Sequence, residues 1–157
     1  MREMKKDEIE YALSSLRSDG EFTDITMKSN GKTFSLHRSI LAIRCPQLLK
    51  EEEVEEEKNG DIGVEVEVFE ALIDFLYSNS YNQRELIETN RLVSLLKISE
   101  RYSVKLLQMM CERTIIQMIS SENVIDLLKL SDELKLKREM EWCVWFVSTT
   151  MMKENYQ

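Results

Sequence analysis

The sequence predicts an α+β fold, in which a small three-stranded sheet is capped by a helical bundle and followed by a C-terminal helical pair. Three observations predict it. Most of the chain carries apolar residues at helical spacing, and two short alternating runs flank an Asn-Gly pair. Glycine and proline are scarce, with 4 and 1 residues among 157. So few turn-forming residues favour long helices joined by short polar connections over a sandwich or a barrel.

The N-terminal part predicts one helix and one β-hairpin. Residues 6–18 carry an apolar stripe at helical spacing, formed by Ile9, Ala12, Leu13 and Leu16. The runs 22–28 and 33–36 alternate in polarity, and Asn30-Gly31 lies between them. Both turn residues tolerate positive φ, so this pattern indicates a hairpin.

The next segment predicts two short helices and a third strand. Residues 37–44 return to helical spacing, and Pro46 suits the first turn of a further helix. The acidic run 51–57 opposes the dipole of that helix, so we expect it to fray by about Glu53 and a solvated loop to reach Gly60. Valines alternate with glutamates over 62–68, which is typical of a strand with one buried face.

The remainder of the chain predicts helices. Their apolar spacing covers the ranges 68–77, 89–98, 104–118, 122–134 and 137–149. With 43% hydrophobic and 32% charged residues, the chain can bury a core as one domain, or as one domain plus a short appendage.

Charge and composition argue against several partners. The 21 basic and 29 acidic residues give a net charge of −8, which repels phosphate backbones and anionic headgroups. We therefore expect neither nucleic acid nor a membrane as partner. No apolar run is long enough to span a bilayer and the N-terminus does not resemble a signal peptide, so we expect a cytoplasmic or nuclear location.

The sequence does not indicate an enzyme, a metal site or a cofactor. His37 is the single histidine, and no glycine-rich phosphate loop or nucleophile motif is present. The glutamates of 51–57 lack the spacing and the turn glycine of a calcium loop. Cys45, Cys111 and Cys143 are expected to be reduced thiols that pack as small hydrophobic residues.

Three phrases of the first half closely resemble the opening of BTB/POZ domains. They are Phe22 to Ile25 (FTDI), Asn30 to Phe34 (NGKTF) and Leu36 to Pro46 (LHRSILAIRCP). The phrases 68–77 (VFEALIDFLY) and 98–111 (ISERYSVKLLQMMC) resemble two later helices of that family. The resemblance implies the BTB/POZ fold and an interaction module.

Residues 119–148 resemble the helical pair that follows many BTB domains, known as the 3-box or the start of a BACK domain. The ending Trp142 to Phe146 also resembles Rho-related BTB proteins and the leucine-zipper-like regulator group. The expected division is thus a BTB/POZ domain at 1–119 and a 3-box or BACK-like extension at 120–157.

The resemblance implies homodimerisation through the first helix. The stripe Ile9, Ala12, Leu13 and Leu16 would then pack against its symmetry mate, and ordinary burial within one subunit is the alternative. No extra N-terminal strand precedes this helix, so the expected dimer is helix-mediated and not strand-swapped.

The resemblance also implies an adaptor that binds the cullin-3 N-terminal domain and presents a substrate recruited by another domain. Carried over by motif, the cullin-binding residues are Val54, Glu56, Tyr102, Ser103 and Lys105. For Val54 and Glu56 the alternative is a solvated acidic loop, and for Tyr102 the alternative is a tyrosine of the core.

Asp24 and Arg38 match a charged pair that some BTB dimers place near a central groove, where transcription-factor members engage corepressors. A pair of this kind more often fixes the fold. The alternative function is a BTB scaffold that only oligomerises or recruits a non-cullin partner such as a transcriptional corepressor.

Overall fold

The computed structural model describes residues 6–55, 60–82 and 89–154. The N-terminal elements are helix α1 (Lys6–Asp19), strands β1 (Ile25–Ser29) and β2 (Lys32–Leu36), and helices α2 (Arg38–Arg44) and α3 (Pro46–Glu55). Helix α4 (Val66–Ser78) follows, and then α5 (Thr89–Arg101), α6 (Lys105–Met118), α7 (Val124–Glu133) and α8 (Lys137–Glu154). In the described part, no helix is long and apolar enough to cross a membrane.

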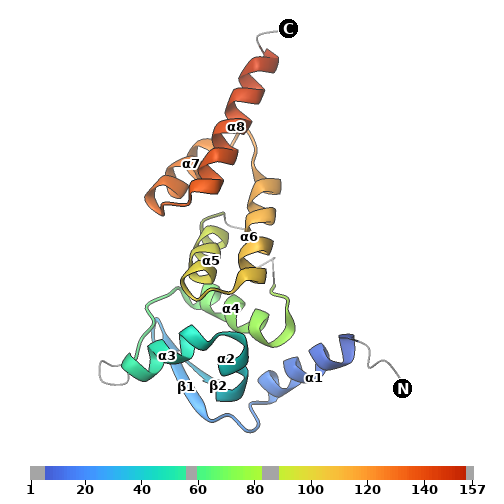
Figure 1. The fold of residues 1–157 in the computed structure, drawn as a ribbon, viewed down its shortest axis with the longest axis vertical. Helices are drawn as coiled ribbons and strands as arrows, with labels where there is room; N and C mark the ends of the chain where they lie inside the picture. The colour runs from blue at the N-terminus through green and yellow to red at the C-terminus, as the bar shows by residue number, and fades with distance from the viewer. Residues whose placement is uncertain (1–5, 56–59, 83–88, 155–157) are drawn as a thin grey trace.

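The elements are arranged along one long axis. Figure 1 shows α1 and the β1–β2 hairpin at one end, α5 and α6 in the middle, and α7 and α8 at the other end. The predicted α+β architecture, dominated by helix, is confirmed, and so are the hairpin and the C-terminal helical pair.

The hairpin forms around the predicted turn. Strands β1 and β2 are antiparallel and pair Ser29 with Lys32, so Asn30 and Gly31 make a two-residue loop. Their φ values of 46° and 81° are the positive values that such a tight turn needs. Helix α3 extends to Glu55, which is two residues beyond the expected fraying point.

The predicted third strand is wrong, because the described residues form a two-stranded sheet. Residues 61–64 lie beside the end of β1, but they form no ladder with it, and the only β-bridge among the described residues there is the isolated one between Lys28 and Asp61. Gly63 has a φ of 70°, which breaks the extended run, and the hydroxyl of Ser29 takes the place of ladder bonds by donating to the Val64 carbonyl at 2.7 Å. Val66 already begins α4, because the helical spacing of the apolar residues that follow overrides the short alternation.

Helix α4 is the centre of the core. Val68, Phe69, Leu72 and Ile73 are all fully buried in it. The rings of Phe34 on β2 and Phe69 on α4 pack edge to face with centroids 5.0 Å apart, which fixes the sheet on this helix. On another side α1 contacts α4, where Arg17 forms an ion pair with Asp74.

The C-terminal helical pair packs on the preceding helices. α7 contacts α5, and α8 contacts α6. The ammonium of Lys97 on α5 donates to the carbonyl of Leu134, at the end of α7, at 3.3 Å. Leu127, Leu136 and Cys143 are buried in this region. The expected division after residue 119 falls in the connection between α6 and α7, and as a domain boundary it stays a prediction.

Candidate interaction surfaces

The predicted dimerisation stripe on α1 is divided between the protein's own core and its surface. Leu13 and Leu16 are half-buried, on the helix that packs against α4. Ile9 is 46% exposed and Ala12 is exposed as well. Packing within one chain therefore accounts for part of the stripe, and Ile9 and Ala12 remain available to a partner.

Helix α2 adds an apolar side chain that the sequence reasoning missed. Ile43 is 79% exposed, whereas Leu41, two residues earlier, is fully buried. Two residues correspond to about 200° around a helix, so the spacing itself places the two side chains on opposite faces. Arg44 and Glu10 both bond the side chain of Asn79, which brings α2 and α1 together at the end of α4.

Of the predicted charged pair, Asp24 contributes to the fold through the backbone of Arg38, and the pairing of the two side chains stays a prediction. A carboxylate oxygen of Asp24 accepts a hydrogen bond at 2.7 Å from the backbone N–H of Arg38, the first residue of α2. The backbone N–H of Asp24 donates to the Leu36 carbonyl at 3.1 Å. Asp24 thus joins the end of the hairpin to the start of α2, where a negative charge also suits the helix dipole.

The α5–α6 turn, which carries the second segment of the predicted cullin-binding site, is joined to α3. The Ser103 hydroxyl donates to the side-chain oxygen of Gln47 on α3 at 3.3 Å, and Arg101 forms an ion pair with Glu51 on the same helix. Val54 lies in the last turn of α3, although its side chain is outside the described residues, as is Glu56. The α5–α6 turn therefore lies against α3 at Gln47 and Glu51, and its position relative to Val54 and Glu56 stays a prediction.

Tyr102 supports this contact from inside. It is 2% exposed, and burial raises the pKa of its hydroxyl, with the Glu51 carboxylate adding to the effect and Arg101 opposing it. Ser103 and Lys105, which follow Tyr102 in the chain, are exposed. The cullin-binding role of all these residues stays a prediction.

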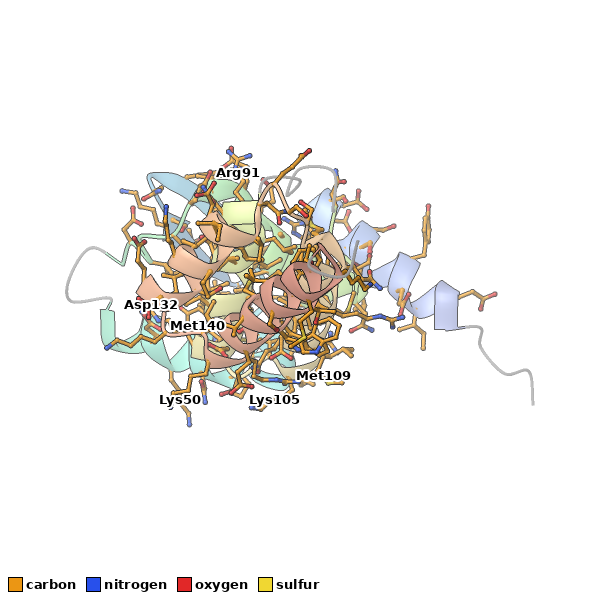
Figure 2. The ribbon with its side chains drawn as sticks, turned by 90° about the horizontal axis from the view of Figure 1, so that it is seen from above. Lys50, Arg91, Lys105, Met109, Asp132 and Met140 are labelled. Carbon is orange, nitrogen blue, oxygen red and sulfur yellow. The ribbon has the colours of Figure 1, made fainter. Side chains whose placement is uncertain are left out.

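Two apolar side chains that the sequence analysis did not single out lie near Lys105 on α6. Leu106 is 52% exposed and Met109 is 64% exposed. Figure 2 shows Met109 and Lys105 of α6 and Lys50 of α3 on the same side of the molecule. Exposed apolar residues next to a polar rim are typical of a protein-binding surface.

A groove lies along α5, between the segment that precedes α4 and the residue that follows α7. Its volume is about 520 Å³, and its lining is mostly apolar. Val64, Ile98 and Leu134 supply apolar lining from the segment before α4, from α5 and from the end of α7. Arg101, which binds α3, also lines it, so the groove adjoins the surface of α3 and the α5–α6 turn.

The single histidine is occupied by the fold. His37 is buried, its Nδ1 lies 2.7 Å from the Tyr77 hydroxyl, and its Nε2 lies 2.6 Å from the Glu21 carbonyl oxygen. A carbonyl oxygen only accepts, so Nε2 carries the hydrogen in this pair and donates it. Both ring nitrogens are thus used to connect α1, the hairpin and α4. In residues 6–55, 60–82 and 89–154, no group of three or more His, Cys, Asp or Glu side chains could hold a metal ion.

Comparison with known proteins agrees with this architecture. The chain is similar in structure to the BTB domain of zebrafish PATZ1, with a TM-score of 0.54 and 18% sequence identity over 74% of this chain and 98% of that one. It is also similar to the BTB domain of human gigaxonin, with a TM-score of 0.53 and 17% identity over 73% of this chain and 96% of that one. The family model of the BTB/POZ domain matches residues 13–119, which is more than half of the chain. The chain therefore belongs to the BTB/POZ domain family, whose members are protein–protein interaction modules.

Proposed function

We propose that this protein is a homodimerising adaptor that binds the N-terminal domain of cullin-3 in a ubiquitin ligase and presents a substrate recruited by another domain. A BTB domain is an interaction module, so the open question is which partner its surfaces fit.

The observation that carries the proposal is the groove of about 520 Å³ along α5, which Leu134, the residue after α7, lines from the side of the C-terminal pair. Without the C-terminal pair, the wall formed by Leu134 would be missing. Val64, Ile98 and Leu134 offer apolar contact to an inserted segment, and Lys97 and Arg101 offer donors at its rim. This arrangement supports a partner that inserts an extended tail, as the N-terminal tail of the cullin would do.

A second contact area lies next to the groove. Lys105, Leu106 and Met109 are exposed at the start of α6, beside the turn that Ser103 ties to α3. An apolar anchor such as Met109, surrounded by polar residues, resembles the arrangement of interface hot spots. The groove and this area together would receive two separate parts of the same partner.

The test is calorimetric titration of the protein with the cullin-3 N-terminal domain, with and without the cullin's N-terminal tail. We expect binding with both partners and a weaker affinity without the tail. Met109→Glu should weaken binding by more than about tenfold, a loss of roughly 1.4 kcal/mol. Ile125→Glu is the matched control, because Ile125 on α7 is 51% exposed and lies outside both contact areas.

The same titration distinguishes the cullin-3 adaptor from the alternative function. Absence of binding to either form of the cullin domain, with the protein folded, would favour a scaffold that recruits a non-cullin partner such as a corepressor. Equal losses for Met109→Glu and Ile125→Glu would remove the start of α6 from the interface.

A further inference from the structure

The outer edge of β2 is an open strand edge in the part of the chain that the structure describes. On β1, the carbonyl of Lys28 accepts a hydrogen bond from the N–H of Ile62 at 2.9 Å, so Lys28 directs its backbone groups away from β2. Lys28 is paired with Thr33, and Thr26 with Ser35. In such non-hydrogen-bonded pairs both partners face outward, so Thr33 and Ser35 direct their N–H and C=O groups away from β1.

These backbone groups of Thr33 and Ser35 have no hydrogen-bond partner among the described residues. Both side chains are exposed, so neither covers the edge. The opposite edge of the sheet already takes an extended segment, since Asp61 and Ile62 lie along β1. In the described residues, the β1 edge of the sheet thus contacts Asp61 and Ile62, and the β2 edge has unpaired backbone groups that can accept a further strand.

A hollow of about 400 Å³ runs beside this open edge. Residues 33–36 line one side of it, and Arg17, Ser18 and Gly20 at the end of α1 line another, with Glu70 of α4. A further strand lies about 4.8 Å from its neighbour, so an added strand needs open space alongside the edge. The hollow is open space of this kind, bordered by α1 and α4.

The charges around the hollow favour a basic occupant. Arg17, which lines the hollow, and Lys32, which precedes the lining residue Thr33 in β2, both face the carboxylate of Glu70, at 3.8 Å and 3.0 Å. Asp19 and Glu21, which flank the lining residue Gly20 in the chain, are exposed. Carboxylates therefore exceed cations here, as they do in the whole chain, and positive charge on a partner would be attracted.

We propose that the outer edge of β2 binds an extended, basic segment of a partner protein, which adds to the sheet as a further strand. The outward N–H and C=O groups of Thr33 and Ser35 supply the main-chain hydrogen bonds, and the acidic rim selects lysine or arginine on the segment. This surface lies at the hairpin, away from the groove beside α5 and α7, so it would serve a partner other than the cullin (Figure 1).

The test uses a short acetylated peptide of alternating valine and lysine as the probe, with amide resonances of the full chain as the readout. We expect the largest changes at Thr33 and Ser35. The same peptide N-methylated at alternate residues cannot donate along one edge, and it should bind at least about tenfold more weakly. In the protein, Ser35→Pro removes an outward N–H at an edge position that tolerates proline, and it should cause a similar loss.

Ser35→Ala is the matched control, because it removes the hydroxyl and keeps the N–H, so its affinity should stay within about twofold of the unaltered chain. The N-methylated peptide probes the same hydrogen bonds without changing the protein, so the result does not depend on the folding of Ser35→Pro. Equal binding of both peptides, or resonance changes only elsewhere, would overturn the proposal. Conversion of a dimer to a monomer by Ser35→Pro, with no peptide binding, would also overturn it and assign the edge to a contact between copies.

Discussion

The guanidinium of Arg138, at the start of α8, lies 2.8 Å from the carboxylate of Glu112 on α6. Glu112 is 7% exposed, and Glu139, the residue after Arg138, is 4% exposed. Burial raises the pKa of Glu139, with the Glu112 and Glu100 carboxylates adding to the effect and Arg138 opposing it. Arg138 thus provides positive charge where two buried carboxyl groups meet at the joint of the C-terminal pair.

Replacing Arg138 should loosen this joint. Arg138→Met leaves the buried Glu112 carboxylate without its ion pair, which typically costs about 1–3 kcal/mol. We expect a lower Tm by differential scanning calorimetry. The control is Lys129→Met, since Lys129 faces Asp126 across an exposed pair at 3.9 Å that contributes little. Equal Tm values for the two variants would contradict the assigned role of Arg138.

Dimerisation should depend on the exposed face that α1 and α2 share. In a twofold dimer each interface residue occurs twice, once in each subunit. Ile43→Asp and Ile9→Asp would therefore each place two charges where apolar side chains would be buried. We expect light scattering at tens of micromolar to show a dimer for the unaltered chain and a monomer for these variants. Ile125→Asp, at the other end of the molecule, should remain dimeric. A monomeric unaltered chain would refute the dimer.

Replacing Tyr102 should lower the stability of the protein, so its effect on binding has to be measured separately. Tyr102→Ala removes a ring that is 2% exposed, and truncation of a large buried aromatic side chain costs about 3–5 kcal/mol. Val54→Ala should weaken cullin-3 binding while keeping the free energy of unfolding nearly unchanged. Chemical denaturation and calorimetric titration of each variant separate the two effects. A Tyr102→Ala protein of normal stability would show that its ring is not part of the core.

Asp61 should make stability depend on pH in the acid range. Hydrogen bonds from the backbone N–H groups of Gly63, Gly31 and Asn30 hold the pKa of its carboxyl below the ordinary value. Because the folded pKa is lower than the unfolded one of about 3.9, the stabilisation is fully present above that pH and is lost as the pH falls through the folded pKa. The difference in free energy of unfolding between the unaltered chain and Asp61→Asn should therefore shrink between neutral pH and pH ~2. A constant difference would contradict the role of the charge.

The thiols should be unreactive in the folded protein. Cys45, Cys111 and Cys143 are free and buried. Burial raises the pKa of Cys45 to about 11 and that of Cys111 to about 12, and it raises the pKa of Cys143 as well. The thiolate is the reactive form, so alkylation at mildly basic pH should be slow and should become fast and complete on unfolding. Rapid labelling of the native chain, followed by mass spectrometry, would contradict this burial.

Local patterns predicted most of the elements, because their causes lie within a few residues. Asn30-Gly31 specified its turn through the φ values that both residues allow, and apolar spacing specified α4. The prediction of the third strand was wrong, and the cause also lies within a few residues. Valine alternation over 62–68 competes with the helical spacing that begins at Val66, and the left-handed Gly63 breaks the extended run.

The candidate site was predicted only in outline. The motif resemblance pointed to Tyr102 and its neighbours, but it could not tell that the ring is buried and that Ser103 and Lys105 are exposed. Helical spacing predicted a helix over 104–118, but it could not tell that Leu106 on α6 is half exposed. An apolar position in a helix pattern indicates a face, and only the neighbours decide whether that face is covered.

The sequence by itself determined the family, the order of the helices, the hairpin and its turn, because each is encoded in short-range spacing or in a continuous motif. The tertiary structure alone decided the groove that Leu134 closes against α5, the pairing of Arg138 with Glu112, and the open edge at Thr33 and Ser35. Each of these needs residues far apart in the chain to meet or to leave a gap. Such distances arise only after the whole core has packed.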